Sequence, residues 1–235
     1  MSTTNTFNAA SASASFAEEV IAAFLEQARN GSKHGIQSAI AKHGPAIVHV
    51  ARNGKGAIAH ASETGRTGII EILLQHGADI NAADDDGKTP LMHAAQMGHP
   101  DMLAFLLDNG ADIHAETPNG LSVLRFATHH KTNTRNQGRM PERKKEAIRL
   151  LVDRGADPRK PDINGLTVAE VLKRTGHANI VMLIDKAVAS RNERLERERL
   201  QALEEMKKSL VMMRKGLPAP ITGKKPATFG KNGPV

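Results

Sequence analysis

The chain of 235 residues contains no cysteine, tryptophan or tyrosine, and only six phenylalanines. The absence of cysteine excludes disulfides, thiolate metal sites and a cysteine nucleophile, and it leaves the redox compartment undetermined. An aromatic content of 3% is unusual for an enzyme with a deep aromatic-lined pocket, but it suits a thin domain built from alanine and leucine. The hydrophobic content of 40% is enough for one sizeable domain.

Long apolar runs and sorting signals are also missing. No apolar run approaches the ~18 residues that indicate a membrane helix. Residues 1–17 are rich in serine, threonine, asparagine and alanine, without the basic start and apolar centre of a secretory signal. They also lack arginine, which argues against a mitochondrial transit peptide. We therefore expect a flexible N-terminal tail over 1–17. We also expect a cytoplasmic protein, or one that is delivered to another cell as an effector.

The chain does contain an internal repeat. The phrase Gly77–Ile80 (Gly-Ala-Asp-Ile) recurs 33 residues later as Gly110–Ile113. Its first three residues recur again at Gly155–Asp157 after 45 residues, so one copy carries 12 extra residues. A fixed period of this length is typical of a solenoid, in which each unit packs only on its neighbours. Including a worn first copy and an atypical last one, we expect about five copies.

Each copy reads as two short helices. In the clearest copy, Thr89 is a good N-cap, and Pro90 suits the first helical position, where its missing N–H has no intrahelical partner to lose. Gly98 ends this helix and Gly110 ends the second one, because glycine adopts the left-handed conformation without a Cβ clash. An extended stretch then leads into a turn at residues 117–120. The prediction is an all-α solenoid of helix-turn-helix repeats.

Three stretches resemble the ankyrin repeat family in period, phrase and order. They are residues 86–95 (DGKTPLMHAA), 98–99 (GH) and 106–113 (LLDNGADI). The resemblance covers roughly residues 20–187 and implies an ankyrin-repeat solenoid. The family's Thr-Pro-Leu-His opening is close to the pattern only at Thr89–Met92, and the histidine is replaced in every copy. We expect this loss to weaken contacts between copies and to leave a modestly stable array.

The net charge of +7 belongs to the C-terminal part of the chain. Residues 186–235 hold twelve lysines and arginines against five glutamates, whereas residues 1–185 are neutral with 20 charges of each sign. Within the repeats, a polar and basic insertion at about 129–143 is expected to be an exposed loop between the two helices of one copy. Two interpretations stay open: a tolerated insertion without a function, and a contact finger for an acidic partner.

The C-terminal part predicts a long helix from Ala178 to about Lys215. Its start, around Ile180 and Ile184, should pack on the last copy, so the repeat domain spans residues 18–187. In the charged segment 188–215, apolar residues alternate by three and four, as in a short coiled coil, at Leu203, Met206, Leu210 and Met213. A capping helix that projects into solvent and a self-associating or partner-binding helix are both open. Residues 216–235 should form a disordered basic tail.

No catalytic or metal-binding pattern emerges among the eleven histidines. Those that follow the repeat, such as His93 and His99, are expected to be structural. His129 and His130 are adjacent and do not share a helix face, and no thiol or carboxylate pair is near them. The run Asp84–Asp86 lacks the spacing of a calcium loop and should cap the following helix. We predict a non-enzymatic protein without cofactor or metal.

The resemblance also implies where a partner binds. Proteins of this family bind partners through the turn tips and inner helices of the concave face. Carried over copy by copy, the implied partner-binding residues are Arg52, Asn53, Lys55, Glu63, Thr64, Asp85, Asp86, Lys88, Gln96, Met97, Asn119, Leu121, His129, His130, Ile163, Leu166, Arg174 and Thr175. The prediction is a protein–protein interaction module or scaffold with an unidentified protein partner. The alternative is nucleic-acid or anionic-surface binding through the basic insertion and C-terminal tail.

Overall fold

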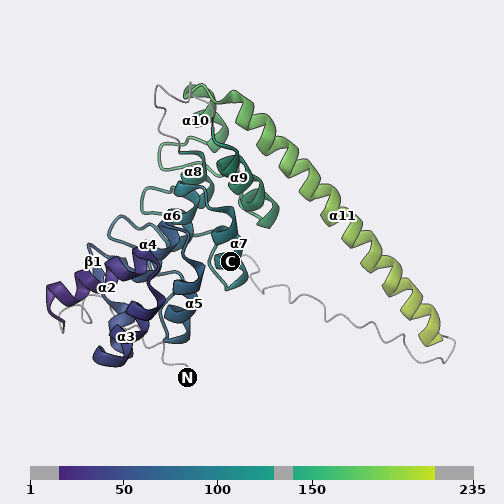
Figure 1. The fold of residues 1–235 in the computed structure, drawn as a ribbon. Coiled ribbons are helices and arrows are strands. Elements are labelled where there is room, and N and C mark those ends of the chain that lie inside the picture. Colours follow the sequence, from purple (N-terminus) through teal and green to yellow (C-terminus); the bar gives the residue numbers. More distant parts are fainter. Residues whose placement is uncertain (1–15, 130–139, 215–235) are drawn as a thin grey trace. The chain divides into compact units, whose positions relative to one another are not determined.

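The computed structural model of the chain describes residues 16–129 and 140–214 (Figure 1). Contacts divide the chain into two compact units, residues 1–189 and 190–235. Most of the N-terminal tail, the centre of the basic insertion and the C-terminal tail lie outside the described residues, so the predictions for those segments stay predictions.

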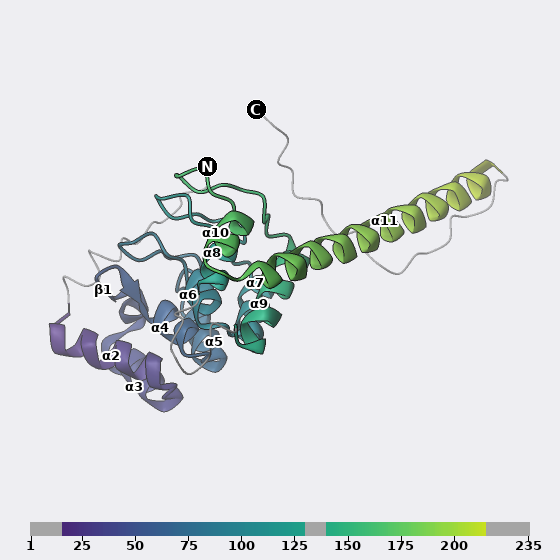
Figure 2. The same ribbon diagram turned by 90° about the horizontal axis from the view of Figure 1, so that it is seen from above.

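The first unit consists of two rows of helices. The first helices of successive copies are α2 (Glu18–Asn30), α4 (Ala57–Glu63), α6 (Pro90–Met97), α8 (Val123–Thr128) and α10 (Val168–Arg174). The second helices are α3 (Lys33–His43), α5 (Thr67–Gln75), α7 (Pro100–Asp108), α9 (Glu142–Arg154) and the start of α11 (Ala178–Arg214). Each helix of the first row packs on the next one in the row. Figures 1 and 2 show the connecting loops gathered along one side of this stack. The predicted helix-pair solenoid is confirmed.

The core lies between successive copies, as the repeat predicts. Ile70 and Leu73 on α5 are fully buried, and so are Leu103 and Leu106, which occupy the equivalent positions on α7. Burial of each such side chain contributes roughly 1.5–3 kcal/mol relative to an exposed position. His99 adds a polar link between copies, because its Nε2 lies 3.0 Å from the carbonyl oxygen of Glu63. A structural role for this histidine was expected from the repeat.

The helix-start signals act as the sequence predicts. The hydroxyl of Thr89 accepts a hydrogen bond from the backbone N–H of Met92, and Gly98 ends α6 in the left-handed conformation with φ = 73°. Helix α10 lacks a proline at its start but has a capping box, in which Thr167 and Glu170 bond each other's backbone N–H groups. These hydrogen bonds from Thr167 lower the pKa of the Glu170 carboxyl. Local capping therefore marks the helix start in copies with different sequences.

The loops that lead into α4, α6, α8 and α10 each form a turn, here called a finger. The first finger follows the 3-10 helix η1 (Pro45–His49) and is a two-stranded hairpin of β1 (Ala51–Arg52) and β2 (Lys55–Gly56). The sequence did not predict these strands. Asn53 (φ = 53°) and Gly54 (φ = 68°) form its tip in the left-handed region that favours a tight hairpin turn. The other fingers turn at 86–87, 119–120 and 164–165, each with a left-handed glycine.

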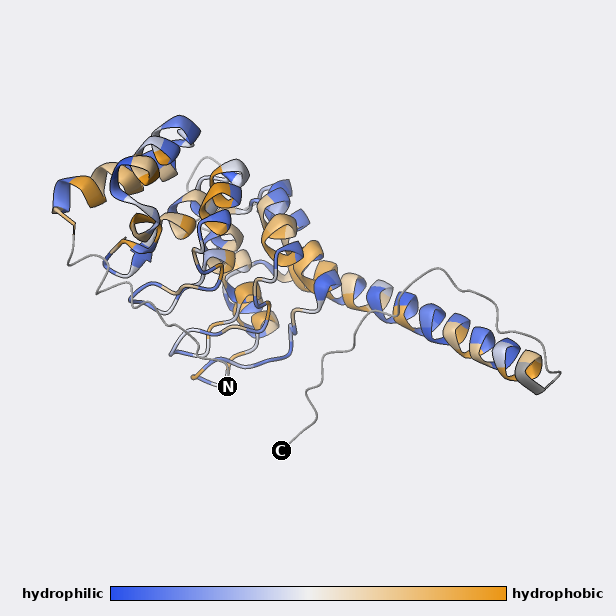
Figure 3. Ribbon diagram, turned by 90° about the horizontal axis from the view of Figure 1, so that it is seen from below, coloured by the Kyte–Doolittle hydropathy of each residue, from blue (hydrophilic) through white to orange (hydrophobic). Residues whose placement is uncertain are grey.

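The predicted long C-terminal helix is confirmed as α11. At its start, Ile180 and Ile184 are buried in the core of the first unit. From Ser190 onward the helix belongs to the second unit, where Leu203, Met206 and Leu210 are exposed. Figure 3 shows hydrophobic and hydrophilic residues alternating along this part. Coiled-coil pairing stays a prediction. In the part of the chain that the structure describes, no helix is long and apolar enough to cross a membrane.

Candidate interaction surface

The fingers place several predicted partner-binding residues in contact with one another. The backbone N–H of Asp85, at the second finger, donates a hydrogen bond to the carbonyl oxygen of Asn53, at the tip of the first (3.4 Å). In the same way, the N–H of Ile163 at the fourth finger donates to the carbonyl oxygen of Asn119 at the third (3.2 Å). Residues separated by 32 and 44 positions in sequence therefore become neighbours in one row.

The second and third fingers meet differently. The position equivalent to Asp85 and Ile163 is Pro118, which has no backbone N–H to donate. Here the contact is steric, because a Cβ atom built on Gly87 would lie 2.4 Å from Cδ of Pro118. Gly87 also has a φ of 75°. Glycine is required at this position by both the turn and the neighbouring finger.

The structure leaves many of the predicted contact residues exposed. The exposed ones are Arg52, Asn53, Asp85, Asp86, Met97, Asn119, His129, Ile163, Arg174 and Thr175. The half-buried ones are Lys55, Glu63, Thr64, Lys88, Gln96, Leu121 and Leu166. His130 lies outside the described residues. Two of the exposed side chains are large and apolar: Met97 is 50% exposed and Ile163 is 70% exposed.

Two ion pairs occupy charged residues of the predicted surface. The ammonium of Lys55 lies 2.6 Å from Glu63 Oε2, and the ammonium of Lys88 lies 2.8 Å from Asp86 Oδ2. Burial raises the pKa of Glu63, but the hydrogen bond and charge of Lys55 outweigh this effect, so the pKa is lowered overall. Lys88 lowers the pKa of Asp86 through its hydrogen bond and charge. These residues are already paired within the chain.

Two predicted residues have internal hydrogen bonds as well. The hydroxyl of Thr64 donates to the carbonyl oxygen of Arg29 at 2.9 Å, which links α4 to the end of α2. Thr175, at the equivalent position after α10, donates to the carbonyl oxygen of Val171 at 3.0 Å. The Thr64 hydroxyl therefore links two copies, whereas the Thr175 hydroxyl bonds to the last turn of its own helix.

Asp84 has a different role from the one predicted. It does not cap α6, since Thr89 fulfils that function. One carboxylate oxygen accepts hydrogen bonds from the backbone N–H groups of Asp86 (3.0 Å) and Lys88 (2.8 Å), which fixes the finger turn. The other oxygen lies 2.9 Å from Nε2 of His93, and both side chains are less than a tenth exposed. The exposed acidic charge at this finger therefore comes from Asp85 and Asp86 alone.

The protonation of His93 follows from its surroundings. Burial lowers its pKa, and the charge of Lys55 lowers it further, against the opposing effect of Asp84. The imidazole is therefore neutral at pH 7. Because a carboxylate can only accept, the proton lies on Nε2 and is donated to Asp84. This bond connects the finger to α6.

The first finger lacks this connection. Ala51 stands 33 residues before Asp84, and His60 stands 33 residues before His93. No carboxylate reaches His60 from this position, and its Nδ1 is buried without a hydrogen-bond partner in the described structure. Burial and the charge of Lys55 lower the pKa of His60 from 6.5 to about 4. The copy that contains α4 therefore has an uncharged histidine where the copy that contains α6 has a bonded pair.

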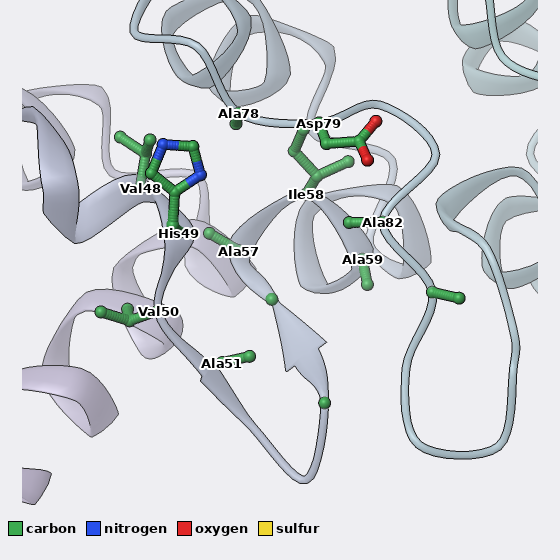
Figure 4. Close-up of a pocket in the computed structure, with 13 residues that line it drawn as sticks. Val48, His49, Val50, Ala51, Ala57, Ile58, Ala59, Ala78, Asp79 and Ala82 are labelled. Atoms are coloured by element: carbon green, nitrogen blue, oxygen red, sulfur yellow. The ribbon is translucent and has the colours of Figure 1, made fainter. Parts of the chain in front are cut away.

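A small pocket lies between the first finger and the next copy. Its volume is about 250 Å³. Figure 4 shows Ala51 and Ala57 on the hairpin side, and Ala78, Asp79 and Ala82 on the loop after α5. The complete lining is Val48, His49, Val50, Ala51, Gly54, Gly56, Ala57, Ile58, Ala59, Ala78, Asp79, Ala82 and Ala83.

Two alanines account for the pocket. Ala51 replaces the residue that is Asp84 in the next copy, and Ala59 replaces Met92, which is fully buried. Both substitutions remove side-chain volume from the same place. This pocket was not predicted from the sequence, although alanine at two positions where other copies have larger residues indicates it.

The geometry of the structure and the comparison with known proteins both indicate a helical repeat protein. The stacked helix pairs with their fingers define a helical repeat protein. The particular repeat is the ankyrin repeat: the family model described as ankyrin repeats (3 copies) matches residues 20–117, from α2 into the third finger. The predicted ankyrin repeats are confirmed. No curated protein matches the chain. Ankyrin repeats are a general protein–protein interaction module, and the family is typically non-enzymatic.

Acidic and imidazole side chains do not gather into a metal site in residues 16–129 and 140–214, where no group of three or more could hold an ion. The close contacts found there are pairs, such as Asp84 with His93. The described surface presents backbone groups, paired charges and the exposed apolar side chains of Met97 and Ile163.

Proposed function

We propose that the protein is a non-enzymatic scaffold that binds another protein through its finger tips and the adjoining ends of the first-row helices. The observation that carries this proposal is the exposure of Met97 and Ile163 at two of the predicted contact positions. Large apolar side chains at half exposure or more on an otherwise polar face are the residues whose burial by a partner gains most. Each contributes on the order of 1–2 kcal/mol when it is covered.

The charges around these side chains support the same surface. Asp85 and Asp86 are exposed at the second finger, and Arg174 is exposed at the end of α10. Negative charge at the second finger and positive charge at the end of α10 favour a partner with a matching dipole and fix its orientation. The ion pair between Lys88 and Asp86 is exposed on the aspartate side, so its rearrangement by a partner has a small free-energy cost, about 0–1 kcal/mol.

A capture experiment tests the proposal. The tagged full chain is used to capture partners from its native cells, which are identified by mass spectrometry. The same capture is repeated with Asp86→Arg combined with Met97→Glu. The matched control is Glu71→Arg combined with Gln75→Glu, which makes the same charge changes on the exposed face of α5. We expect specific partners to be lost only with the first variant. Retention of every partner by that variant would refute the concave face as the contact surface.

The described residues near the basic insertion give little support to the nucleic-acid alternative. Arg143 lies 3.8 Å from Asp101, and Lys145 lies 2.6 Å from Glu142. Lys144 is buried, which lowers its pKa, and its ammonium donates to the carbonyl oxygen of His129. Three basic side chains of this region thus already have partners within the chain. The central insertion and the C-terminal tail, on which this alternative also depends, lie outside the described residues.

A further inference from the structure

The pocket at the first finger combines an apolar slot with a carboxylate in its lining. Its walls consist of the methyl groups and backbone of alanine and glycine together with Val48, Val50 and the imidazole of His49, with Ile58 between the two sides and Asp79 on the loop (Figure 4). A volume of about 250 Å³ accommodates one long side chain rather than a folded ligand. Asp79, Ala82 and Ala83 in its lining are exposed, so a side chain of a partner can reach the slot from the loop after α5.

A second carboxylate lies at the edge of the same slot. Gly54 is part of the lining, and a Cβ atom on Gly54 would lie 2.3 Å from Oδ1 of Asp85. The carboxylate of Asp85 is therefore in contact with the finger that forms one wall. Asp79 therefore lines the slot on its loop side, and Asp85 contacts Gly54 on its hairpin side.

The described cations around these two carboxylates have other ion-pair partners. The nearby basic residues of the described structure are already paired: Arg52 with Glu18, Lys55 with Glu63 and Lys88 with Asp86. One oxygen of Asp79 accepts the backbone N–H of Asn81 at 2.9 Å, and no lysine or arginine among residues 16–129 and 140–214 forms an ion pair with Asp79 or Asp85. An uncompensated negative potential therefore surrounds an apolar slot.

We propose that this slot binds an arginine side chain of the partner protein, with its aliphatic stem between the alanines and its guanidinium between Asp79 and Asp85. The stem of arginine packs well on apolar walls while its charged end stays at the surface. The planar guanidinium has five donors and bridges two carboxylates better than the ammonium of lysine. This inference rests on the proposed function, which it deepens by naming the chemistry of the partner.

An NMR titration tests the slot without any partner protein. The isotope-labelled full chain is titrated with Nα-acetyl-L-arginine N-methylamide, and in parallel with the citrulline and norleucine analogues. We expect saturable shifts of the backbone amides of Gly54, Gly56 and Ala82 with the arginine probe. The citrulline analogue, which has the same shape without the charge, should bind at least fivefold more weakly. The norleucine analogue should also be at least fivefold weaker.

Variants locate the binding to the named carboxylates. Asp79→Asn combined with Asp85→Asn should weaken the arginine probe at least fivefold, since asparagine keeps the turn acceptor and loses the charge. The matched control is Asp112→Asn, because Asp112 is the equivalent of Asp79 one copy later and accepts the N–H of His114 at 2.8 Å. It should leave the titration unchanged. Ala82→Leu, which fills the slot without changing any charge, should also abolish the shifts.

Three results would contradict the proposal that the slot binds an arginine side chain. They are the absence of saturable shifts at these amides, equal binding of the arginine and citrulline probes, and unchanged binding in the Asp79/Asp85 double variant. None of these results depends on capturing a partner. If the slot fails while Asp86→Arg with Met97→Glu still abolishes capture, the finger surface stands and only its arginine specificity is wrong. If capture is unaffected while the probe binds as expected, the slot stands and the larger contact surface is wrong.

Discussion

Removal of the Asp84 carboxylate should destabilise the protein far more than removal of the same residue in another finger. Asp84→Ala loses two turn hydrogen bonds and the bond to His93. Asp162→Ala is the matched control, because Asp162 makes the same two turn bonds, to the N–H groups of Asn164 and Leu166, and has Val171 where His93 would stand. The difference between the two variants therefore isolates the histidine contact.

The magnitude follows from the burial of that contact. Each turn hydrogen bond contributes about 1 kcal/mol, and both variants lose two of them. Asp84→Ala in addition leaves the N–H of His93 buried without an acceptor, which costs about 1–3 kcal/mol. We expect the free energy of unfolding to fall by about 2 kcal/mol in Asp162→Ala and about 4 kcal/mol in Asp84→Ala.

Urea denaturation followed by far-UV circular dichroism at pH 7.5 measures both values. A double-mutant cycle with His93→Phe, the residue found at the equivalent position Phe126, should give a coupling energy of about 2 kcal/mol. Equal destabilisation by the two alanine variants, or a coupling energy below about 0.5 kcal/mol, would show that the pair does not stabilise the fold.

Three further predictions concern other parts of the structure. Gly87→Ala should lower the free energy of unfolding by about 2 kcal/mol more than Gly77→Ala, because both glycines have positive φ but only Gly87 lies against Pro118. Urea denaturation of the two variants measures this difference. Equal effects would exclude the steric contact. The pKa of His60 is lowered in the folded state, so stability is highest above pH 6.5 and falls as the pH decreases toward 4. At pH 5 the loss should be on the order of 2 kcal/mol, and denaturation of His60→Gln should lack this component. If α11 pairs with a second copy, Leu203→Glu with Leu210→Glu should convert a dimer to a monomer in sedimentation velocity, while a monomeric parent chain would rule out self-association at the concentrations used.

Much of the fold can be read from the sequence because its determinants are local and repeated. Thr89, Pro90 and Gly98 mark one helix, and the 33-residue period carries the result to the other copies. The hairpin of the first finger was not predicted, since a strand pair of two residues each has no recognisable period. The role of Asp84 was also missed, because it depends on a pairing with His93 across nine residues of chain that bends back on itself.

The repeat register predicts a set of contact positions but not the chemistry of the side chains at them. The repeat register placed Met97 and Ile163 at contact positions, and their exposure in the structure is consistent with that register. It could not show that Lys55 and Lys88 are already paired, because their partners differ in sequence distance. The slot at the first finger is lined by Ala51 and Ala59, at positions where the next copy has the larger side chains of Asp84 and Met92. This difference becomes apparent only when the copies are compared position by position.

Pro118 interrupts the row of backbone hydrogen bonds between the finger tips, because it has no N–H to donate. The first and second fingers are tied by one backbone hydrogen bond, and the third and fourth by another, whereas the middle contact relies on surfaces that touch. The loops just before these two fingers remain joined, because the backbone N–H of Asp112 donates to Oδ1 of Asn81 at 2.8 Å. The spacing of the second and third finger tips therefore depends on the ring of Pro118 against Gly87, and a change of either residue should move the tips without breaking a hydrogen bond between them.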